Sequence, residues 1–404
     1  MLSVLLRTLA SLQAVKLPTL TARSHVSLIM RAIANTINDD SLIDLPNRGA
    51  DLLRNHLRRL QLSPTETLLL DGGTGEELFR RGVPDDRKIW SATAIVNEQY
   101  HSVVEDVHRS FVKAGSQAIT TNSYGITPGV GFTDGEEVKR LVGIAGQIAR
   151  RAVTTSSSLT PSALVLGSLG PLVESYRPDL IMNHADGVVA YQFAVHGLYP
   201  HIDVYLAETM SCVEEACQAI DAISIFYCGL KENDHDPKHP LLVSFTLNQD
   251  GNLRDGEAVV EAIPKVTEYA YRKKVNLIGV LFNCCEPESI SKAMYEIRRD
   301  TRIQQYLQHP SLELLSDSLL EDDRPPTILL GAYANRLTPV DPEWTLESSE
   351  GAQAMRDDLS PDQYSSEFVH LWRSSNRIGG VQLIGGCCGI GPDYISALKK
   401  QLEQ

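Results

Sequence analysis

The stretch TLLLDGG, residues 67–73, is a short apolar run that ends in an acidic residue and two glycines. Its length suits a strand buried on both faces, because such strands are nearly continuous apolar runs of a few residues. Runs of the same kind recur along the chain, and this recurrence decides the fold. The further runs are AITTNSY (118–124), ALVLGS (163–168), VYLAET (204–209), LLVSFT (241–246), NLIGVLFNCC (276–285), TILLGAY (327–333) and VQLIGGCC (381–388).

Helical patterns separate the eight runs. Between 100 and 111 the apolar residues return to one helix face, and Gly115 follows as a C-cap. Strands that alternate with helices predict an α/β protein, a (β/α)8 TIM barrel over 65–404 with an N-terminal extension. A doubly wound open sheet is the alternative. However, the loop GTGEEL after the first run has Leu78 where a dinucleotide-binding loop has its third glycine.

Composition narrows the class of protein. With 404 residues, 43% hydrophobic and 22% charged, the chain can bury a large core. Its formal charge of −14 argues against a nucleic-acid partner and agrees with cationic small ligands. No run reaches the roughly 18 apolar residues of a transmembrane helix. The seven cysteines are unevenly placed, which is unlike a secreted disulfide framework.

The N-terminal segment differs from the rest of the chain. Residues 1–38 contain basic and hydroxyl side chains and no acidic residue, which is typical of an organelle transit peptide. A disordered arm and a misassigned start codon are the alternatives. We expect a mitochondrial or other organellar protein if the segment is a transit peptide, and a cytoplasmic one otherwise. Residues 39–64 resemble a linker with a short helix, and the sequence leaves the oligomeric state open.

Polar and sulfur-bearing residues gather where the predicted strands end. In a TIM barrel these ends form the active face. Strands six and eight flank strand seven, so Cys284 and the pair Cys387–Cys388 should meet. Three thiolates with an open fourth position describe a catalytic zinc site. A redox role for the adjacent pair is the alternative, but a vicinal disulfide is strained and the pair lacks the C-x-x-C spacing of oxidoreductases.

A zinc site of this kind suits chemistry at a substrate thiol. A free thiol has a pKa near 8.5 and is mostly protonated at neutral pH. Coordination to zinc removes the proton, and three cysteinate ligands leave the substrate sulfur electron-rich. We therefore expect displacement at a methyl group carried by a cationic donor. Asp71 and Glu208, at two strand ends, are candidates to hold an ammonium group while remaining partly solvated.

The blocks LLLDGGTGEEL, ITTNSYG, GSLGP, LAET, FNCC and IGGCCGIGPDYI resemble those of the homocysteine S-methyltransferase family. That resemblance implies a zinc-containing (β/α)8 barrel that makes methionine from homocysteine and a cationic methyl donor. By similarity, the zinc ligands are Cys284, Cys387 and Cys388. The homocysteine pocket would contain Asp71, Gly72, Gly73, Thr121 and Glu208, and the donor site Trp90, Tyr176 and Asn335.

The identity of the donor is the weakest part of the resemblance. The stretch IWSA at 89–92 resembles the branch that uses S-methylmethionine or S-adenosylmethionine. After the seventh run, however, YANRLTPVDPEW replaces the usual family sequence on the donor side. A betaine-dependent enzyme, a methyltransferase for selenocysteine or another thiol, and a non-catalytic zinc or thiol sensor remain alternatives.

Overall fold

The computed structural model describes residues 48–63, 66–86, 88–154, 162–230, 238–307, 327–339, 354–373 and 380–403. The candidate transit peptide at 1–38 lies outside these residues. Within the described ranges, no helix is both long and apolar enough to span a bilayer.

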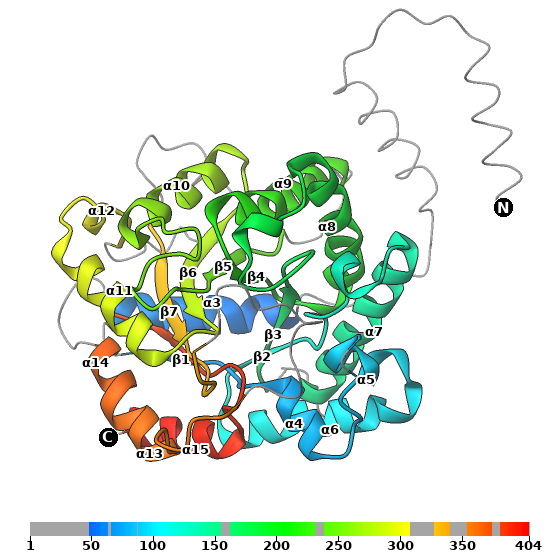
Figure 1. Cartoon of the computed structure of the whole chain (residues 1–404), viewed down its shortest axis with the longest axis horizontal. Coiled ribbons are helices and arrows are strands. Elements are labelled where there is room, and N and C mark those ends of the chain that lie inside the picture. Colours follow the sequence, from blue (N-terminus) through cyan, green and yellow to red (C-terminus); the bar gives the residue numbers. More distant parts are fainter. Residues whose placement is uncertain are drawn as a thin grey trace, which may run out of the picture. The chain divides into compact units, whose positions relative to one another are not determined.

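Eight parallel strands form one sheet whose order follows the chain around a barrel (Figure 1). The (β/α)8 TIM barrel predicted from the sequence is confirmed, and each predicted run overlaps one strand. All eight are buried on both faces, which explains their apolar, β-branched composition. The strands are β1 (Leu68–Leu69), β2 (Ala118–Thr120), β3 (Leu164–Leu169), β4 (Val204–Met210), β5 (Leu241–Phe245), β6 (Leu277–Asn283), β7 (Leu329–Tyr333) and β8 (Leu383–Ile384).

The barrel closes between β1 and β2 through side chains as well as backbone. The amide N–H of Gln117 donates to the carbonyl of Leu69 at 2.7 Å, and its side-chain Oε1 accepts from the Leu69 N–H at 3.0 Å. Two residues after Leu69, the Asp71 carboxylate accepts a hydrogen bond from the N–H of Thr120 at 2.7 Å. A side-chain acid thus continues the hydrogen bonding that the short strand β1 leaves unfinished.

Helices surround the sheet, as amphipathic connections between parallel strands require. In α6, Val104, Val107 and Phe111 are buried, and Gly115 ends the helix with φ 123°, a conformation that suits glycine. The helices are α4 (Thr74–Arg80), α5 (Thr93–Val96), α6 (His101–Ala114), α7 (Gly135–Val153), α8 (His184–Leu198), α9 (Val213–Gly229), α10 (Val259–Arg272), α11 (Pro287–Arg299), α12 (Gln304–Leu307), α13 (Pro361–Gln363), α14 (His370–Arg373) and α15 (Pro392–Leu402).

One more helix, α3 (Arg48–Leu62), lies across the barrel behind the strands in Figure 1. Its residues Leu53, Leu57 and Leu60 are buried and join the leucines that fill the barrel interior. The carbonyl of Leu60 accepts from Nε2 of Gln382, just before β8, so α3 covers the N-terminal end of the strands. The helix lies within the segment that the sequence suggested as a linker, and its leucine face is core.

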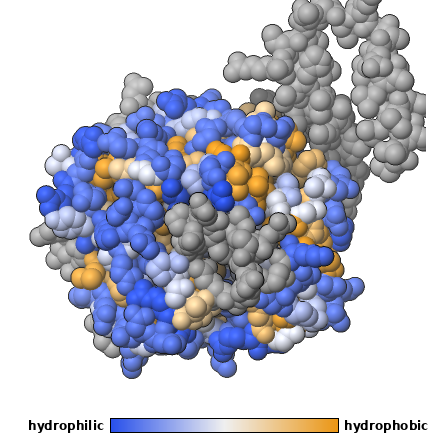
Figure 2. Space-filling view, in the orientation of Figure 1, coloured by the Kyte–Doolittle hydropathy of each residue, from blue (hydrophilic) through white to orange (hydrophobic). Residues whose placement is uncertain are grey.

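The face drawn in Figure 2 is mostly hydrophilic, with scattered hydrophobic patches. This agrees with a chain that carries 51 acidic and 37 basic residues.

Candidate active site

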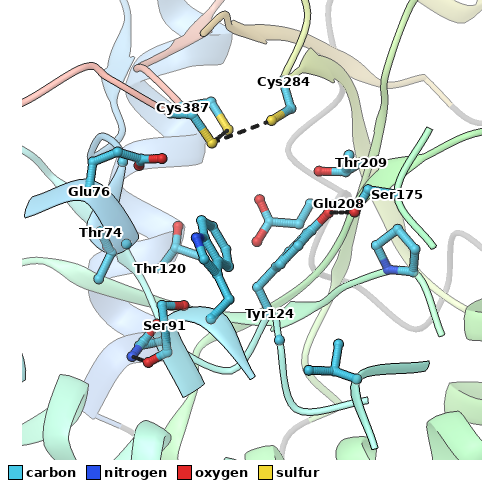
Figure 3. A pocket seen from close by; sticks show the side chains of 18 of the residues that line it. Thr74, Glu76, Ser91, Thr120, Tyr124, Ser175, Glu208, Thr209, Cys284 and Cys387 are labelled. Carbon is cyan, nitrogen blue, oxygen red and sulfur yellow. Dashed lines mark hydrogen bonds between the residues drawn. The ribbon is translucent and has the colours of Figure 1, made fainter. Parts of the chain in front are cut away.

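Three thiols meet at the C-terminal end of the barrel. Cys284 directly follows β6, and Cys387 and Cys388 lie in the turn after β8. Their sulfurs all lie within 4.8 Å of one another, with Cys284 to Cys388 at 3.7 Å and Cys387 to Cys388 at 4.0 Å. Tetrahedral zinc with bonds of about 2.3 Å separates its sulfurs by about 3.8 Å, whereas a disulfide needs about 2.05 Å. The three free thiols could therefore hold one metal ion (Figure 3).

Backbone contacts fix the turn that carries the adjacent pair. The N–H of Cys387 donates to the carbonyl of Ala334 after β7, and Gly389 reverses the chain with φ 78°. Gly73 packs so closely on this turn that a Cβ there would stand 2.7 Å from the Cys387 carbonyl oxygen. A side chain at Gly72 would similarly meet the carbonyl of Ile390 at 2.1 Å. Gly72 and Gly73, which follow β1, thus let the chain pass close to the turn that carries Cys387 and Cys388.

The thiols open into a cavity of about 710 Å³. Nearly all the site residues predicted from the sequence line this cavity; the exception is Asn335, which is buried beside Cys284 and is absent from the described lining. Cys285, the neighbour of Cys284, is also absent from that lining, and burial raises the pKa of its thiol to about 12. The predicted residues that do line the cavity are Asp71, Gly72, Gly73, Trp90, Thr121, Tyr176, Glu208, Cys284, Cys387 and Cys388.

The two predicted ammonium-binding carboxylates are more buried than the sequence suggested. We expected partly solvated groups, but Asp71 is 4% exposed and Glu208 is 8% exposed. The strand ends lie inside the cavity, which explains the difference. Burial, the largest cause, raises the pKa of each carboxyl to about 7. Glu208 accepts hydrogen bonds from the hydroxyls of Ser168 and Tyr333, while Asp71 accepts from the Thr120 hydroxyl as well as its N–H.

Comparisons with known proteins identify the family. A family model described as homocysteine S-methyltransferase matches residues 68–402. The chain belongs to the homocysteine S-methyltransferase family. It is therefore a methyltransferase, and the family's reaction is methyl transfer to homocysteine.

Relatives of this homocysteine S-methyltransferase span most of its length. The chain is 25% identical to homocysteine S-methyltransferase of Escherichia coli over 86% of this chain and 98% of that protein. It is also 25% identical to methionine synthase of Mycobacterium tuberculosis, over 80% of this chain but 24% of that longer protein. Among solved structures, the metallated form of MmuM from E. coli has a TM-score of 0.60 at 21% identity, over 86% of this chain and 100% of that one. That structural likeness shows the shared fold.

The thiols of this methyltransferase differ in their proton affinity. Hydrogen bonds from the thiols of Cys387 and Cys388 hold the pKa of Cys284 well below its usual range, and the hydroxyl of Tyr176, 3.0 Å from Sγ, adds to this effect. The side chain of Asn335 also stabilises the Cys284 thiolate. The sequence suggested Tyr176 and Asn335 as donor-site residues, and the structure places both against Cys284.

Strained backbone is concentrated at the cavity. Five non-glycine residues among those described have positive φ, and four of them line the cavity. Such conformations cost about 1–3 kcal/mol each and persist where the surroundings impose them, often at functional sites. The four are Trp90 (φ 47°), Tyr176 (φ 68°), Thr209 (φ 60°) and Cys284 (φ 51°).

Sequence reasoning missed three acids that line the cavity, Glu76, Asp85 and Glu174, of which Glu76 lies nearest the thiols. Glu76, in the first turn of α4, lines the cavity beside the thiols, and burial, the largest cause, raises its pKa to about 7. Its Oε2 is inaccessible to solvent and has no hydrogen-bond partner among the described residues. The motif GTGEEL contains two adjacent acids that look alike in the sequence. In the structure Glu77 forms ion pairs with Arg80 and Arg81, and this distinguishes it from Glu76.

Proposed function

We propose that this homocysteine S-methyltransferase takes its methyl group from a sulfonium donor, S-methylmethionine or S-adenosylmethionine, and that Cys284, Cys387 and Cys388 hold a zinc ion. The observation that carries the proposal is the set of three free thiols within 4.8 Å of one another, facing a cavity lined by acids and aromatic rings. Soft thiolate ligands favour zinc among the common divalent ions.

The metal proposal is supported by the donor set. The sulfur separations of 3.7 and 4.0 Å match those of tetrahedral zinc thiolates and exceed those of a disulfide. Hydrogen bonding to Cys284 lowers the pKa of that thiol and raises the pKa of Cys387 and Cys388, so the cluster favours one thiolate, the form that binds metals, before any ion is bound. When bound, zinc would lower the pKa of an incoming thiol.

The acids and the threonine at the strand ends suit the amino-acid part of homocysteine. Asp71 and Glu208 offer carboxylate oxygens for its ammonium group, and Thr121 lies between them in the order of the strands. Figure 3 shows Glu208 pointing into the cavity below Cys284 and Cys387. An ammonium held by Glu208 leaves the thiol end of homocysteine free to reach the three sulfurs.

Methyl transfer then needs no acid or base at the carbon. The thiol proton of homocysteine leaves to solvent on binding. A lone pair of its sulfur forms the new S–CH₃ bond, while the donor's S–CH₃ bond breaks and its electrons stay on the donor sulfur. The thiolate charge and the sulfonium charge cancel, giving methionine and a neutral thioether. The protein contributes mainly by holding both sulfurs in line with the methyl carbon.

Aromatic rings support a cationic donor. The indole of Trp90 packs against Gly75, where a Cβ would stand 2.9 Å from the ring, and it meets the ring of Tyr124 edge to face. Both residues line the cavity. An indole face attracts a sulfonium through cation–π contact, worth about 0.5–2 kcal/mol.

The test is a comparison of donors with the full chain. Purified protein would be incubated with homocysteine and, separately, with S-methylmethionine, S-adenosylmethionine or betaine, and methionine would be quantified by mass spectrometry with a methyl-labelled donor. We expect labelled methionine from at least one sulfonium. Labelled methionine from betaine alone contradicts the proposed donor. Bound zinc with no methionine from any donor favours a sensor, and preference for selenohomocysteine in a competition assay favours a different acceptor.

A further inference from the structure

Five acids line the cavity, and one of them, Glu76, stands beside the thiols. Beside Asp71 and Glu208, the cavity wall carries Glu76, whose backbone belongs to α4 rather than to a strand. Figure 3 shows its carboxylate pointing into the cavity towards Cys387, from a different side than Glu208. The absence of a side chain at Gly73 leaves room for it, since a Cβ there would lie 2.9 Å from Oε2 of Glu76.

The hydrogen bonding of Glu76 differs from that of Asp71 and Glu208. Both oxygens of Asp71 accept from Thr120, and both oxygens of Glu208 accept from hydroxyl groups. Oε2 of Glu76 is buried and lacks a partner among the described residues, although the Cys388 thiol and the Gly389 N–H stabilise the carboxylate as a whole. A buried acceptor without a donor costs free energy, so its presence in a binding cavity points to a ligand that supplies the hydrogen.

The surroundings of Glu76 indicate which ligand this is. The adjacent Gly75 packs against the Trp90 indole, and Glu76 and Trp90 both line the cavity. This pair suits a cation that also offers N–H groups. A sulfonium amino acid has both, because it carries an ammonium group beside the charged sulfur. Betaine has a quaternary nitrogen without hydrogen and cannot satisfy Oε2.

We propose that Glu76 is a specificity-determining residue that accepts a hydrogen bond from the ammonium group of the sulfonium amino-acid donor. This inference rests on the proposed sulfonium chemistry and adds the group by which the donor is selected. The ammonium group is several bonds away from the transferred methyl group and keeps its charge during the reaction. Its hydrogen bond to Glu76 therefore stabilises the ground state and the transition state equally. It therefore lowers the KM of the donor and leaves kcat nearly unchanged.

The experiment compares S-methylmethionine with its deamino analogue, which keeps the sulfonium and lacks the ammonium. Wild-type protein is expected to prefer S-methylmethionine in kcat/KM by about 10-fold or more, the worth of a hydrogen bond to a charged group. In Glu76→Gln the preference should fall towards one, through a higher KM for S-methylmethionine. Glu76→Asp, which keeps the charge, should retain part of the preference. Glu136→Gln, at an exposed site in α7, is the matched control.

Three results with the Glu76 variants would overturn the inference. The first is an unchanged preference in Glu76→Gln and Glu76→Asp with methionine still formed, which leaves the proposed function intact. The second is a raised KM for homocysteine instead of the donor, which would place Glu76 in the acceptor site. The third is loss of bound zinc in Glu76→Gln, which would make the residue part of the metal site. Methionine from betaine alone in the wild type would overturn both this inference and the proposed function.

Discussion

The hydroxyl of Tyr176 lies 3.0 Å from Sγ of Cys284, although the two residues are far apart in the chain. Both residues have left-handed backbone. The guanidinium of Arg254 lies over the Tyr176 ring, 4.8 Å from its centre. The phenol and the thiol therefore share a hydrogen bond, in which the phenol donates when Cys284 is a thiolate. The role of the phenol in the structure is to position and polarise Cys284.

Removal of that hydroxyl should weaken the acidity of Cys284. In Tyr176→Phe the hydrogen bond that lowers the pKa of Cys284 is lost, so the thiol pKa rises. Alkylation of metal-free protein at pH 7, followed at the Cys284 peptide by mass spectrometry, should be slower in the variant. Tyr124→Phe is the control, because its hydroxyl bonds to Ser175 rather than to a thiol. Equal alkylation rates in Tyr176→Phe and wild type would contradict this role.

Helix α3 should contribute to the stability of the barrel. Leu57→Ala removes a buried side chain from the cluster at the N-terminal end of the strands and should lower the free energy of unfolding by about 2–5 kcal/mol. Arg58→Ala, exposed on the same helix, should change it by less than about 0.5 kcal/mol. Urea denaturation of both variants makes the comparison. Equal midpoints would mean that α3 is an appended helix rather than core.

Asp71 should stabilise the seam between β1 and β2 as well as bind substrate. Asp71→Ala leaves the N–H of Thr120 without its acceptor and should cost about 1–3 kcal/mol of unfolding free energy. Thr120→Val removes only the hydroxyl that bonds to the other oxygen, so the expected cost is smaller, about 1 kcal/mol. Thermal or urea unfolding without substrate separates this effect from binding. A fully stable Asp71→Ala protein would show that the seam does not depend on the carboxylate.

Acid should destabilise the protein through a buried histidine. His108 is fully buried in α6, neither ring nitrogen has a partner among the described residues, and burial lowers its pKa to about 4. Between about pH 6.5 and pH 4 the unfolded chain binds a proton that the folded state refuses, so stability falls as the pH falls.

Comparison with His108→Leu isolates this contribution. The unfolding free energy of the wild type relative to the variant should drop by up to about 3 kcal/mol from pH 7 to pH 4. The measurement compares the unfolding free energies of the wild type and the variant because Asp71 and Glu208 are present in both. Their pKa values are raised to about 7, so their effect on stability with falling pH is opposite to that of His108. They favour the folded state most at low pH, where both are protonated. A pH-independent difference would show that His108 is paired or solvated.

The sequence predicted the parts of the fold that depend on periodicity. Eight buried strands leave eight apolar runs, and the barrel order then requires the ends of β6 and β8 to lie on either side of β7. The meeting of Cys284 with Cys387 and Cys388 follows from that order. The left-handed backbone at Cys284, and the absence of Cys285 from the cavity lining, are features that no pattern in the sequence encodes.

Other features depend on contacts between distant residues. The leucine face of α3 has the pattern of any amphipathic helix, and only the barrel shows what it covers. Glu76 and Glu77 are indistinguishable in the sequence, but the two arginines that follow Glu77 pair with it and leave its neighbour facing the cavity. Asn335, in the loop after β7, hydrogen-bonds to Cys284 yet is absent from the cavity lining, a placement that depends on contacts between distant residues.

The central claim is that Cys284, Cys387 and Cys388 hold the metal ion on which methyl transfer depends, and metal content per chain tests it most directly. Inductively coupled plasma mass spectrometry of the purified full chain should find about one zinc in the wild type and in Cys285→Ala, and almost none in Cys284→Ala. Methyl transfer to homocysteine should follow the same pattern. Wild-type levels of zinc in Cys284→Ala, or loss of zinc in Cys285→Ala with the fold intact, would contradict the account.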